Sequence, residues 1–273
     1  EYMEEADDGD DVYLTIDSNI QLFTENAVKK AAEESEAEWT LLVVADAKTG
    51  AILSYATSPS YDPNKRDMVS YIDPLTGNSY EPGSTFKIIT LASAIEEEKV
   101  DLLKDNFYDG GSVTIDGARI KCWRYYRPHG SQSLRQALMN SCNPFFITVG
   151  QRLGVHKYFK YFEAFGFTQK TGIDLPGEAI SQYVPEEKYG IVELSSASFG
   201  QTNSLTPVQV CSGICAIANG GTLLKPYIVS EIKDAKGNTI SKTEKTEVRR
   251  VISEETSEKV RNMMKAVYLH DVD

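Results

Sequence analysis

The spacing of apolar residues changes twice along this chain of 273 residues, and the change restricts the folds that the chain can adopt. Near the N-terminus, residues 40–45 and 51–56 have strand patterns separated by the turn Lys48-Thr49-Gly50. In the middle of the chain apolar residues recur at helical spacing, and strand patterns return at 227–233 and 246–251. This segregation of strands and helices predicts an α+β fold, with part of a sheet and a helical subdomain.

Helical patterns account for most of the remaining chain. Helices are expected at 18–35, 84–97, 133–141, 144–153, 156–165, 207–218 and 254–267. Ser18-x-x-Gln21 predicts a capping box at the start of the first helix. The apolar stripe of that helix is expected to contain Ile20, Phe23, Ala27 and Ala31. The helix at 84–97 is expected to bury one face, formed by Ile88, Leu91, Ala92 and Ile95.

Short strands and one long loop complete this prediction. A strand is expected at 12–16, and residues 113–122 predict a ribbon that turns at Asp116-Gly117. The segment 58–80 is rich in Pro, Asp, Asn and Ser, which is typical of a loop.

The charge balance excludes one class of partner. The chain has 28 Lys and Arg against 40 Asp and Glu, a net charge of −12, so nucleic acid is not expected to bind. Residues 1–11 carry much of this acidity and predict a frayed lead-in. The sequence contains no run of about 18 apolar residues, so no membrane-spanning helix is predicted. Because the first residue is not Met, we expect the chain to be a piece of a longer protein.

The cysteines do not follow a metal-binding spacing. Cys122, Cys142, Cys211 and Cys215 do not match a zinc pattern, and neither His129 nor His156 stands at a ligand position beside them. We therefore expect no metal and no cofactor. Cys211 and Cys215 are four residues apart on an apolar helix and are predicted to be buried thiols.

Ser84 and Lys87 form the pattern most closely tied to chemistry, directly after Glu81-Pro82-Gly83. Residues three apart on a helix share a face, so a hydroxyl nucleophile would lie beside an amine that can deprotonate it. Free N–H groups at a helix N-terminus also favour an oxyanion. The pattern indicates a serine acyl-transfer enzyme, although a capping serine followed by a surface lysine has the same spacing.

A second Ser-x-x-Lys in the same chain serves as a control. Ser230 and Lys233 lie in a predicted strand, where residues three apart face opposite sides. This second pair therefore cannot act together, and the spacing alone is a weak indication.

Ser141-Cys142-Asn143 strengthens the acyl-transfer interpretation. It is expected between two helices, the second of which has Pro144 in its first turn. A loop in this position can direct a hydroxyl and an amide into a cleft. Ser141 can relay a proton between Lys87 and a leaving group, and Asn143 can hold a substrate amide. A helix end followed by a Pro-started helix explains this motif alone, but does not explain both motifs.

Together these motifs resemble those of penicillin-binding proteins and serine β-lactamases. Further segments look like the transpeptidase domain of class B penicillin-binding proteins, and the resemblance covers nearly the whole chain. They are Leu14-Thr15-Ile16-Asp17 with Gln21, Thr49-Gly50-Ala51-Ile52-Leu53, His129-Gly130, Gly172-Ile173-Asp174-Leu175-Pro176-Gly177-Glu178, and Gly200-Gln201 with Thr206-Pro207. Cys122-Trp123 with His129-Gly130 most resembles the sporulation and cell-division branch of Gram-positive bacteria.

The resemblance implies a peptidoglycan D,D-transpeptidase with an antiparallel sheet flanked by helices. Ser84 would attack the D-Ala-D-Ala carbonyl of a stem peptide, with Lys87 as its base, and an amine from a neighbouring stem would complete the cross-link. Ser141 and Asn143 would complete the site, and Trp123 would contact the substrate. β-Lactams would acylate Ser84.

The resemblance also implies a location and partners. The domain would lie on the extracytoplasmic face of a bacterial membrane, held by an anchor outside this chain. Its expected partners are a membrane glycosyltransferase and division or sporulation proteins.

One part of the family pattern is missing. Lys48-Thr49-Gly50 and Lys170-Thr171-Gly172 both stand before positions where the family has its catalytic Lys-Thr-Gly, which should follow the helix at 254–267. We therefore expect residues 1–273 to form a transpeptidase domain that is incomplete at its C-terminus, with an incomplete sheet. We also expect the chain by itself to be nearly inactive.

Three alternatives remain open. A serine β-lactamase would need a deacylating base, for which Glu178 is one candidate that the sequence does not place. A membrane-bound β-lactam sensor would retain the same residues. In addition, Cys122 and Cys142 would gate catalysis if they formed a disulfide, whereas two reduced thiols would not.

Overall fold

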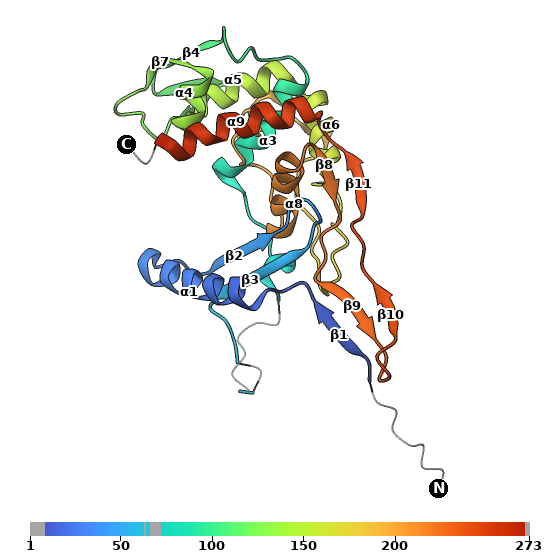
Figure 1. The fold of residues 1–273 in the computed structure, drawn as a ribbon. Helices are drawn as coiled ribbons and strands as arrows, with labels where there is room; N and C mark the ends of the chain where they lie inside the picture. The colour runs from blue at the N-terminus through green and yellow to red at the C-terminus, as the bar shows by residue number, and fades with distance from the viewer. Residues whose placement is uncertain (1–8, 63, 66–71, 271–273) are drawn as a thin grey trace.

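The computed structural model describes residues 9–62, 64–65 and 72–270 (Figure 1). Its strands are β1 (Asp11–Leu14), β2 (Thr40–Ala45), β3 (Ile52–Ser58), β4 (Asn106–Asp109), β5 (Ser112–Ile115), β6 (Ala118–Lys121), β7 (Gly130–Ser133), β8 (Thr222–Leu224), β9 (Val229–Lys233), β10 (Thr239–Lys242) and β11 (Glu247–Arg250). Its helices are α1 (Ser18–Ser35), α2 (Pro74–Gly77), α3 (Lys87–Glu96), α4 (Leu134–Met139), α5 (Asn143–Leu153), α6 (Val155–Ala164), α7 (Ile191–Ala197), α8 (Pro207–Ala218) and α9 (Glu254–His270). Two short 3₁₀ helices are η1 (Gly83–Phe86) and η2 (Glu186–Lys188).

The molecule has a largely helical end and an end that carries strands together with α1 (Figure 1). Helix α1 and the hairpin β2-β3 lie at one end of the molecule, and α3, α4, α5 and α9 gather at the other (Figure 1). The described strands form a three-stranded sheet, β1-β9-β10, and the antiparallel pairs β2-β3, β4-β7, β5-β6 and β8-β11. The α+β prediction is therefore confirmed.

The start of α1 differs from the prediction. Asp17, not Ser18, caps the helix and accepts hydrogen bonds from the N–H groups of Asn19 and Ile20 at 2.9 and 3.0 Å. Gln21 instead forms two hydrogen bonds with the backbone of Tyr55 on β3, at 3.0 and 3.1 Å. The predicted capping box is wrong because Gln21 is used to attach the helix to the hairpin.

The buried face of α1 also differs from the prediction. Thr24 and Val28 are its buried residues, whereas Phe23 is 73% exposed, and Ala27 and Ala31 are exposed as well. Thr24 Oγ1 lies 2.6 Å from Ser54 Oγ on β3. These polar contacts turn the helix so that the face of Thr24 and Val28 meets the hairpin.

Helix α3 runs through the core and is buried on nearly every side. Eight of its ten residues are buried, including the predicted Leu91, Ala92 and Ile95. The expectation of one buried face is too narrow, because α5, α6, α8 and α9 all contact this helix. A cluster of fully buried aromatic rings lies in the same core, with Phe145, Phe146 and Phe162 among its members.

Several predicted elements are present in the structure, and it also contains several short elements that the sequence did not predict. The β5-β6 ribbon and the strand β9 are confirmed, while β4, β7, β8, β10, α2 and α7 were not predicted. Most of these elements have only three or four residues, too few to show a periodic pattern. Helix α2 interrupts the predicted loop at 58–80, of which residues 63 and 66–71 lie outside the described part.

The predicted acidic lead-in is only partly testable. Residues 1–8 lie outside the described part, and Asp11 is ordered in β1, where it pairs with Lys233 of β9. The described part of the chain contains no helix that is both long and apolar enough to cross a membrane.

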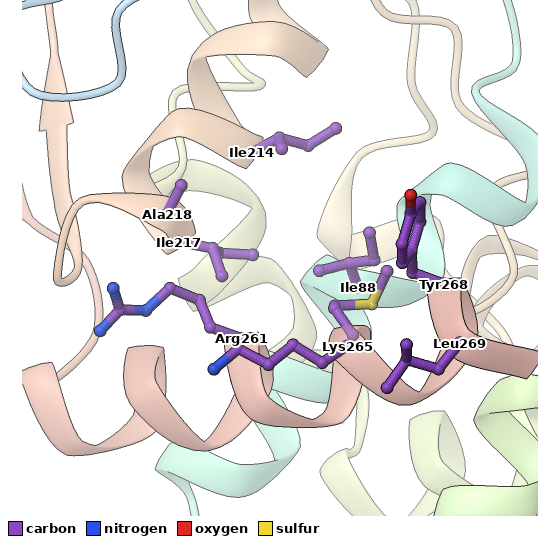
Figure 2. A pocket seen from close by; sticks show the side chains of 9 residues that line it. Ile88, Ile214, Ile217, Ala218, Arg261, Lys265, Tyr268 and Leu269 are labelled. Atoms are coloured by element: carbon purple, nitrogen blue, oxygen red, sulfur yellow. The ribbon is translucent and has the colours of Figure 1, made fainter.

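A hollow of about 590 Å³ opens between α3, α8 and α9. Figure 2 shows the side chains that converge on it, including Ile88, Ile217 and Tyr268. Its lining is apolar apart from Arg261 and Lys265. None of the predicted site residues lines this hollow.

Candidate active site

The turn before Ser84 is held from behind by the loop at 200–202. Gly83 has φ +56°, and its N–H donates to the carbonyl oxygen of Gly200 at 2.9 Å. The Glu81 carboxylate accepts a hydrogen bond from the N–H of Thr202 at 2.7 Å. A Cβ on Gly200 would overlap the carbonyl oxygen of Gly83, so only glycine fits. Gly200 belongs to the family-like segments, but only the fold reveals this contact.

Ser84 is exposed and Lys87 is buried, although they are three residues apart. Ser84 lies in η1, and α3 begins at Lys87, whose N–H bonds to the carbonyl oxygen of Ser84. The helix at Ser84 is thus 3₁₀ rather than α. In a 3₁₀ turn, side chains three apart are nearly eclipsed, so the predicted shared face is retained.

The Lys87 amine contacts both residues of the second motif. Its Nζ donates to the carbonyl oxygen of Ser141 at 2.8 Å, to Ser141 Oγ at 2.9 Å and to Asn143 Oδ1 at 2.7 Å. The three donors of an ammonium group are therefore all used. The structure brings together three of the four predicted catalytic side chains through direct hydrogen bonds.

Burial controls the charge of this amine. Lys87 is 2% exposed, and desolvation lowers its pKa to about 8, because a charged amine loses its water there. The ring of Phe146 lies 5.3 Å from Nζ and favours the charged form. The neutral form of Lys87 is consequently far more populated near neutral pH than that of an exposed lysine.

The loop that carries Ser141 has an unusual backbone. Ser141 has φ +47°, a left-handed conformation that non-glycine residues seldom adopt and that often occurs at functional sites. Helix α5 follows at Asn143, with Cys142 at the N-cap and Pro144 in the first turn, as the sequence predicts. Asn143 Nδ2 also donates to the carbonyl oxygen of Lys121 at 3.3 Å, so this side chain links α5 to the β5-β6 ribbon.

Trp123 lies beside this loop. Its indole Nε1 donates to the carbonyl oxygen of Asn140 at 2.8 Å, and the side chain is 56% exposed. The ring meets His129 edge to face, with 5.7 Å between ring centroids. An exposed aromatic ring is thus anchored one residue from Ser141.

Neither of the two Lys-Thr-Gly segments lies in a described strand. Lys48-Thr49-Gly50 forms a turn, and Lys170-Thr171-Gly172 lies outside the described strands. Glu178 accepts hydrogen bonds from Thr171 and Gly172, which gives this carboxylate a structural role in that segment. The control pair behaves as predicted, because Ser230 and Lys233 both lie in β9.

The thiols Cys122 and Cys142 are free and buried beside Asp109 and His129. Burial raises the pKa of Cys142 to about 12 and also raises that of Cys122. The hypothesis of a gating disulfide stays untested. Cys211 and Cys215 are only partly buried, so the prediction that both thiols are buried is wrong.

Comparison with known proteins gives a family match over most of the chain. The model of the penicillin-binding protein transpeptidase domain matches residues 40–271. Stage V sporulation protein D of Bacillus subtilis is 43% identical over 268 residues, which are 95% of this chain and 41% of that protein. Penicillin-binding protein PbpB of Mycolicibacterium smegmatis is 30% identical over 274 residues, which are 98% of this chain and 41% of that protein. The chain thus spans about two fifths of the length of these relatives.

Solved structures have the same fold. Penicillin-binding protein 3 of Mycobacterium tuberculosis, complexed with aztreonam, matches with a TM-score of 0.88 and 27% identity over 98% of this chain and 60% of that one. Penicillin-binding protein 2X of Streptococcus thermophilus also gives a TM-score of 0.88, at 24% identity, over 97% of this chain and 39% of that one. This chain belongs to the penicillin-binding protein transpeptidase domain family.

Proposed function

We propose that this chain is the transpeptidase part of a serine-type D,D-transpeptidase, which cross-links peptidoglycan stem peptides through an acyl-enzyme on Ser84. The observation that carries the proposal is the buried Lys87 amine, whose Nζ lies within 2.9 Å of three oxygens of Ser141 and Asn143. A capping serine followed by a surface lysine does not explain why this amine is buried among three oxygens. The names of relatives support it, since several are peptidoglycan D,D-transpeptidases.

The proposed reaction has two acyl transfers. Ser84 Oγ attacks the carbonyl carbon of the penultimate D-Ala, and its proton passes to neutral Lys87. The bond to the terminal D-Ala then breaks, and a proton relayed through Ser141 neutralises the leaving amine. An amine of a second stem peptide attacks the ester, which forms the cross-link and returns a proton to Ser84.

Asn143 and Trp123 are proposed to position the substrate. The Asn143 side chain is held at both ends, by Lys87 and by the carbonyl oxygen of Lys121, so little conformational entropy is lost when it orients an amide. The exposed ring of Trp123 offers an apolar surface that is anchored to the carbonyl oxygen of Asn140.

The location and partners are proposed from the relatives. β-Lactams are proposed to acylate Ser84, supported by a structural neighbour complexed with aztreonam. We place the domain on the extracytoplasmic face of a bacterial membrane, anchored by a segment outside this chain. A membrane glycosyltransferase and division or sporulation proteins are its proposed partners.

We further propose that residues 1–273 form one transpeptidase domain in which the third motif is missing. Neither Lys-Thr-Gly of the chain lies in a described strand, and β2 pairs only with β3 among the described strands.

The test uses the complete protein that contains this chain. It is given a donor peptide ending in D-Ala-D-Ala and a D-amino acid acceptor, and D-Ala release and exchange product are measured. Both are expected in the wild type and in Ser230→Ala, whereas Ser84→Ala should lose both. Rapid turnover of nitrocefin would instead indicate a β-lactamase, and stable acylation without peptide turnover would indicate a sensor.

A further inference from the structure

Four side chains with metal-binding atoms meet behind the Ser141 loop. Asp109 ends β4, Cys122 follows β6, His129 precedes β7, and Cys142 caps α5. One ligand atom from each lies within 4.8 Å of the other three. We propose that these four residues bind a zinc ion that holds the Ser141 loop in place.

The cluster is sealed from solvent. Asp109 and Cys122 are 1% exposed, Cys142 is fully buried, and the side chain of His129 is 2% exposed. His129 Nδ1 lies 2.7 Å from Asp109 Oδ2 and 3.6 Å from Cys122 Sγ. A closed set of four ligands without an open position is typical of a structural zinc site rather than a catalytic one.

The donor set selects the metal. Two sulfurs, one imidazole nitrogen and one carboxylate oxygen match the ligands of zinc, whereas magnesium and calcium prefer oxygen alone. The four atoms are slightly more spread than bound ligands require. Tetrahedral zinc ligands lie about 3.3–3.8 Å apart. The more distant atoms must therefore approach one another, and His129 Nδ1 and Asp109 Oδ2, which are 2.7 Å apart, must separate.

Burial disfavours thiolates at both sulfurs in the absence of an ion, but hydrogen-bond donors also face them. N–H groups of Arg124 and Asn143 face the Cys122 sulfur, and the Phe145 N–H faces that of Cys142. The amide of Gln132, 3% exposed, is directed at Cys142, and no other group in the described residues bonds its nitrogen. These donors stabilise metal-bound sulfur from the outside.

Every proton that zinc binding displaces has a destination. Zinc replaces the proton of each thiol, and both protons pass to solvent. To bind zinc through Nδ1, His129 must carry its ring proton on Nε2, and Nδ1 and Asp109 Oδ2 then face the ion instead of one another. The ion then joins the β4-β7 ribbon to α5 and fixes Cys142 between Ser141 and Asn143.

Sequence spacing cannot reveal this site. The four residues are separated by irregular intervals that match no zinc pattern, and Asp109 was not singled out. Pairing of Asp109 with Gly130 across β4 and β7 places His129 beside Asp109. The expectation of no metal came from spacing alone, and this proposal replaces it.

The experiment measures zinc in the chain of residues 1–273 after purification under reducing conditions with zinc and removal of loose metal. About one zinc per chain is expected. Cys122→Ser and Cys142→Ser should each lower zinc affinity by at least about tenfold. The matched control is the double variant Cys211→Ser and Cys215→Ser, which removes two other thiols and should retain the metal.

Cobalt replacement gives a second measurement that needs no variant. Cobalt in the wild-type chain should show the charge-transfer absorption of thiolate ligands and the spectrum of a tetrahedral site. Folded wild-type chain without zinc, cobalt spectra without thiolate absorption, or a Cys122–Cys142 disulfide formed under these conditions would each overturn the proposal. These readouts involve no turnover, so their failure leaves the proposed transpeptidase function untouched.

Discussion

The surroundings of Lys87 suit the proposed role of its amine as a base. Its amine is buried, yet three oxygens surround it, so the charged form is desolvated but still hydrogen-bonded. Desolvation is the larger effect and lowers the pKa to about 8. In the proposed mechanism only the neutral amine accepts the proton of Ser84, and the neutral fraction grows as the pH rises toward and past 8.

The first prediction concerns the pH dependence of acylation. In the complete protein, the rate of Ser84 acylation by a β-lactam should rise with pH and level off above about 8. Above pH 8, Lys87→Ala should lower the rate by about 10²–10⁴-fold, the usual contribution of a general base, and the difference should shrink at lower pH as the wild-type amine becomes protonated. Stopped-flow acylation measures both. Lys233→Ala is the control, and a rate that is flat from acid to alkaline pH would contradict the role of Lys87.

At the scale of secondary-structure elements, single contacts decide where an element starts and which face it buries. Asp17 begins α1, and the hydrogen bonds of Gln21 and Thr24 set its rotation against β3. The loop at Gly200 supports η1 in the same way, because the two backbones are in direct contact at Gly83.

The second prediction tests the cap of α1. Asp17→Ala should lower the free energy of unfolding by about 1 kcal/mol, because two N–H groups lose their acceptor. Ser18→Ala should change it by less than about 0.5 kcal/mol. Urea unfolding of the two variants measures the difference. Equal losses would restore the predicted cap at Ser18.

The third prediction compares two glycines with similar backbone angles. Gly200 and Gly237 have φ +87° and +82°, but only at Gly200 would an added Cβ have other atoms within 4 Å. Gly237→Ala should cost about 1–2 kcal/mol for the left-handed backbone alone. Gly200→Ala should cost about 1–3 kcal/mol more, because Gly83 must move.

Thermal unfolding of both variants measures this difference. In the complete protein, Gly200→Ala should also slow acylation of Ser84, since the turn that presents it is displaced, whereas Gly237→Ala should not. Similar stability and similar acylation in the two variants would show that the Gly83–Gly200 contact has no such role.

At the scale of the whole molecule, the described residues contain Ser84, Lys87 and the Ser141 loop, but no Lys-Thr-Gly in a strand. The resemblance to class B penicillin-binding proteins implies that such a strand would provide one N–H of the oxyanion hole. Loss of one such donor typically lowers the rate by about 10²–10³-fold.

The fourth prediction follows from the lack of a Lys-Thr-Gly strand among the described residues. Fluorescent penicillin should label residues 1–273 at least about 10²-fold more slowly than the complete protein. Gel fluorescence after timed incubation measures the rates, and Ser84→Ala gives the background. Stable, stoichiometric labelling of residues 1–273 at Ser84 would refute the prediction.

Much of the site could be predicted from the sequence, because its parts are local. Ser84 and Lys87 are three residues apart, and Ser141 and Asn143 are two apart, so short-range geometry places each pair. The left-handed Ser141 and the 3₁₀ turn at Ser84 were missed, since neither has a distinctive sequence pattern. The exposed Phe23 was misplaced because two polar contacts outweigh the apolar periodicity of α1.

The sequence by itself determined the family, the α+β class and the chemical groups of the site, because these follow from local motifs and periodicity. Only the tertiary structure decided that Lys87 is buried against Ser141 and Asn143, that Gly200 supports Gly83, and that Asp109, Cys122, His129 and Cys142 meet. The physical reason is that these contacts join segments far apart in the chain. Strand pairing and core packing select such contacts, and sequence spacing does not record them.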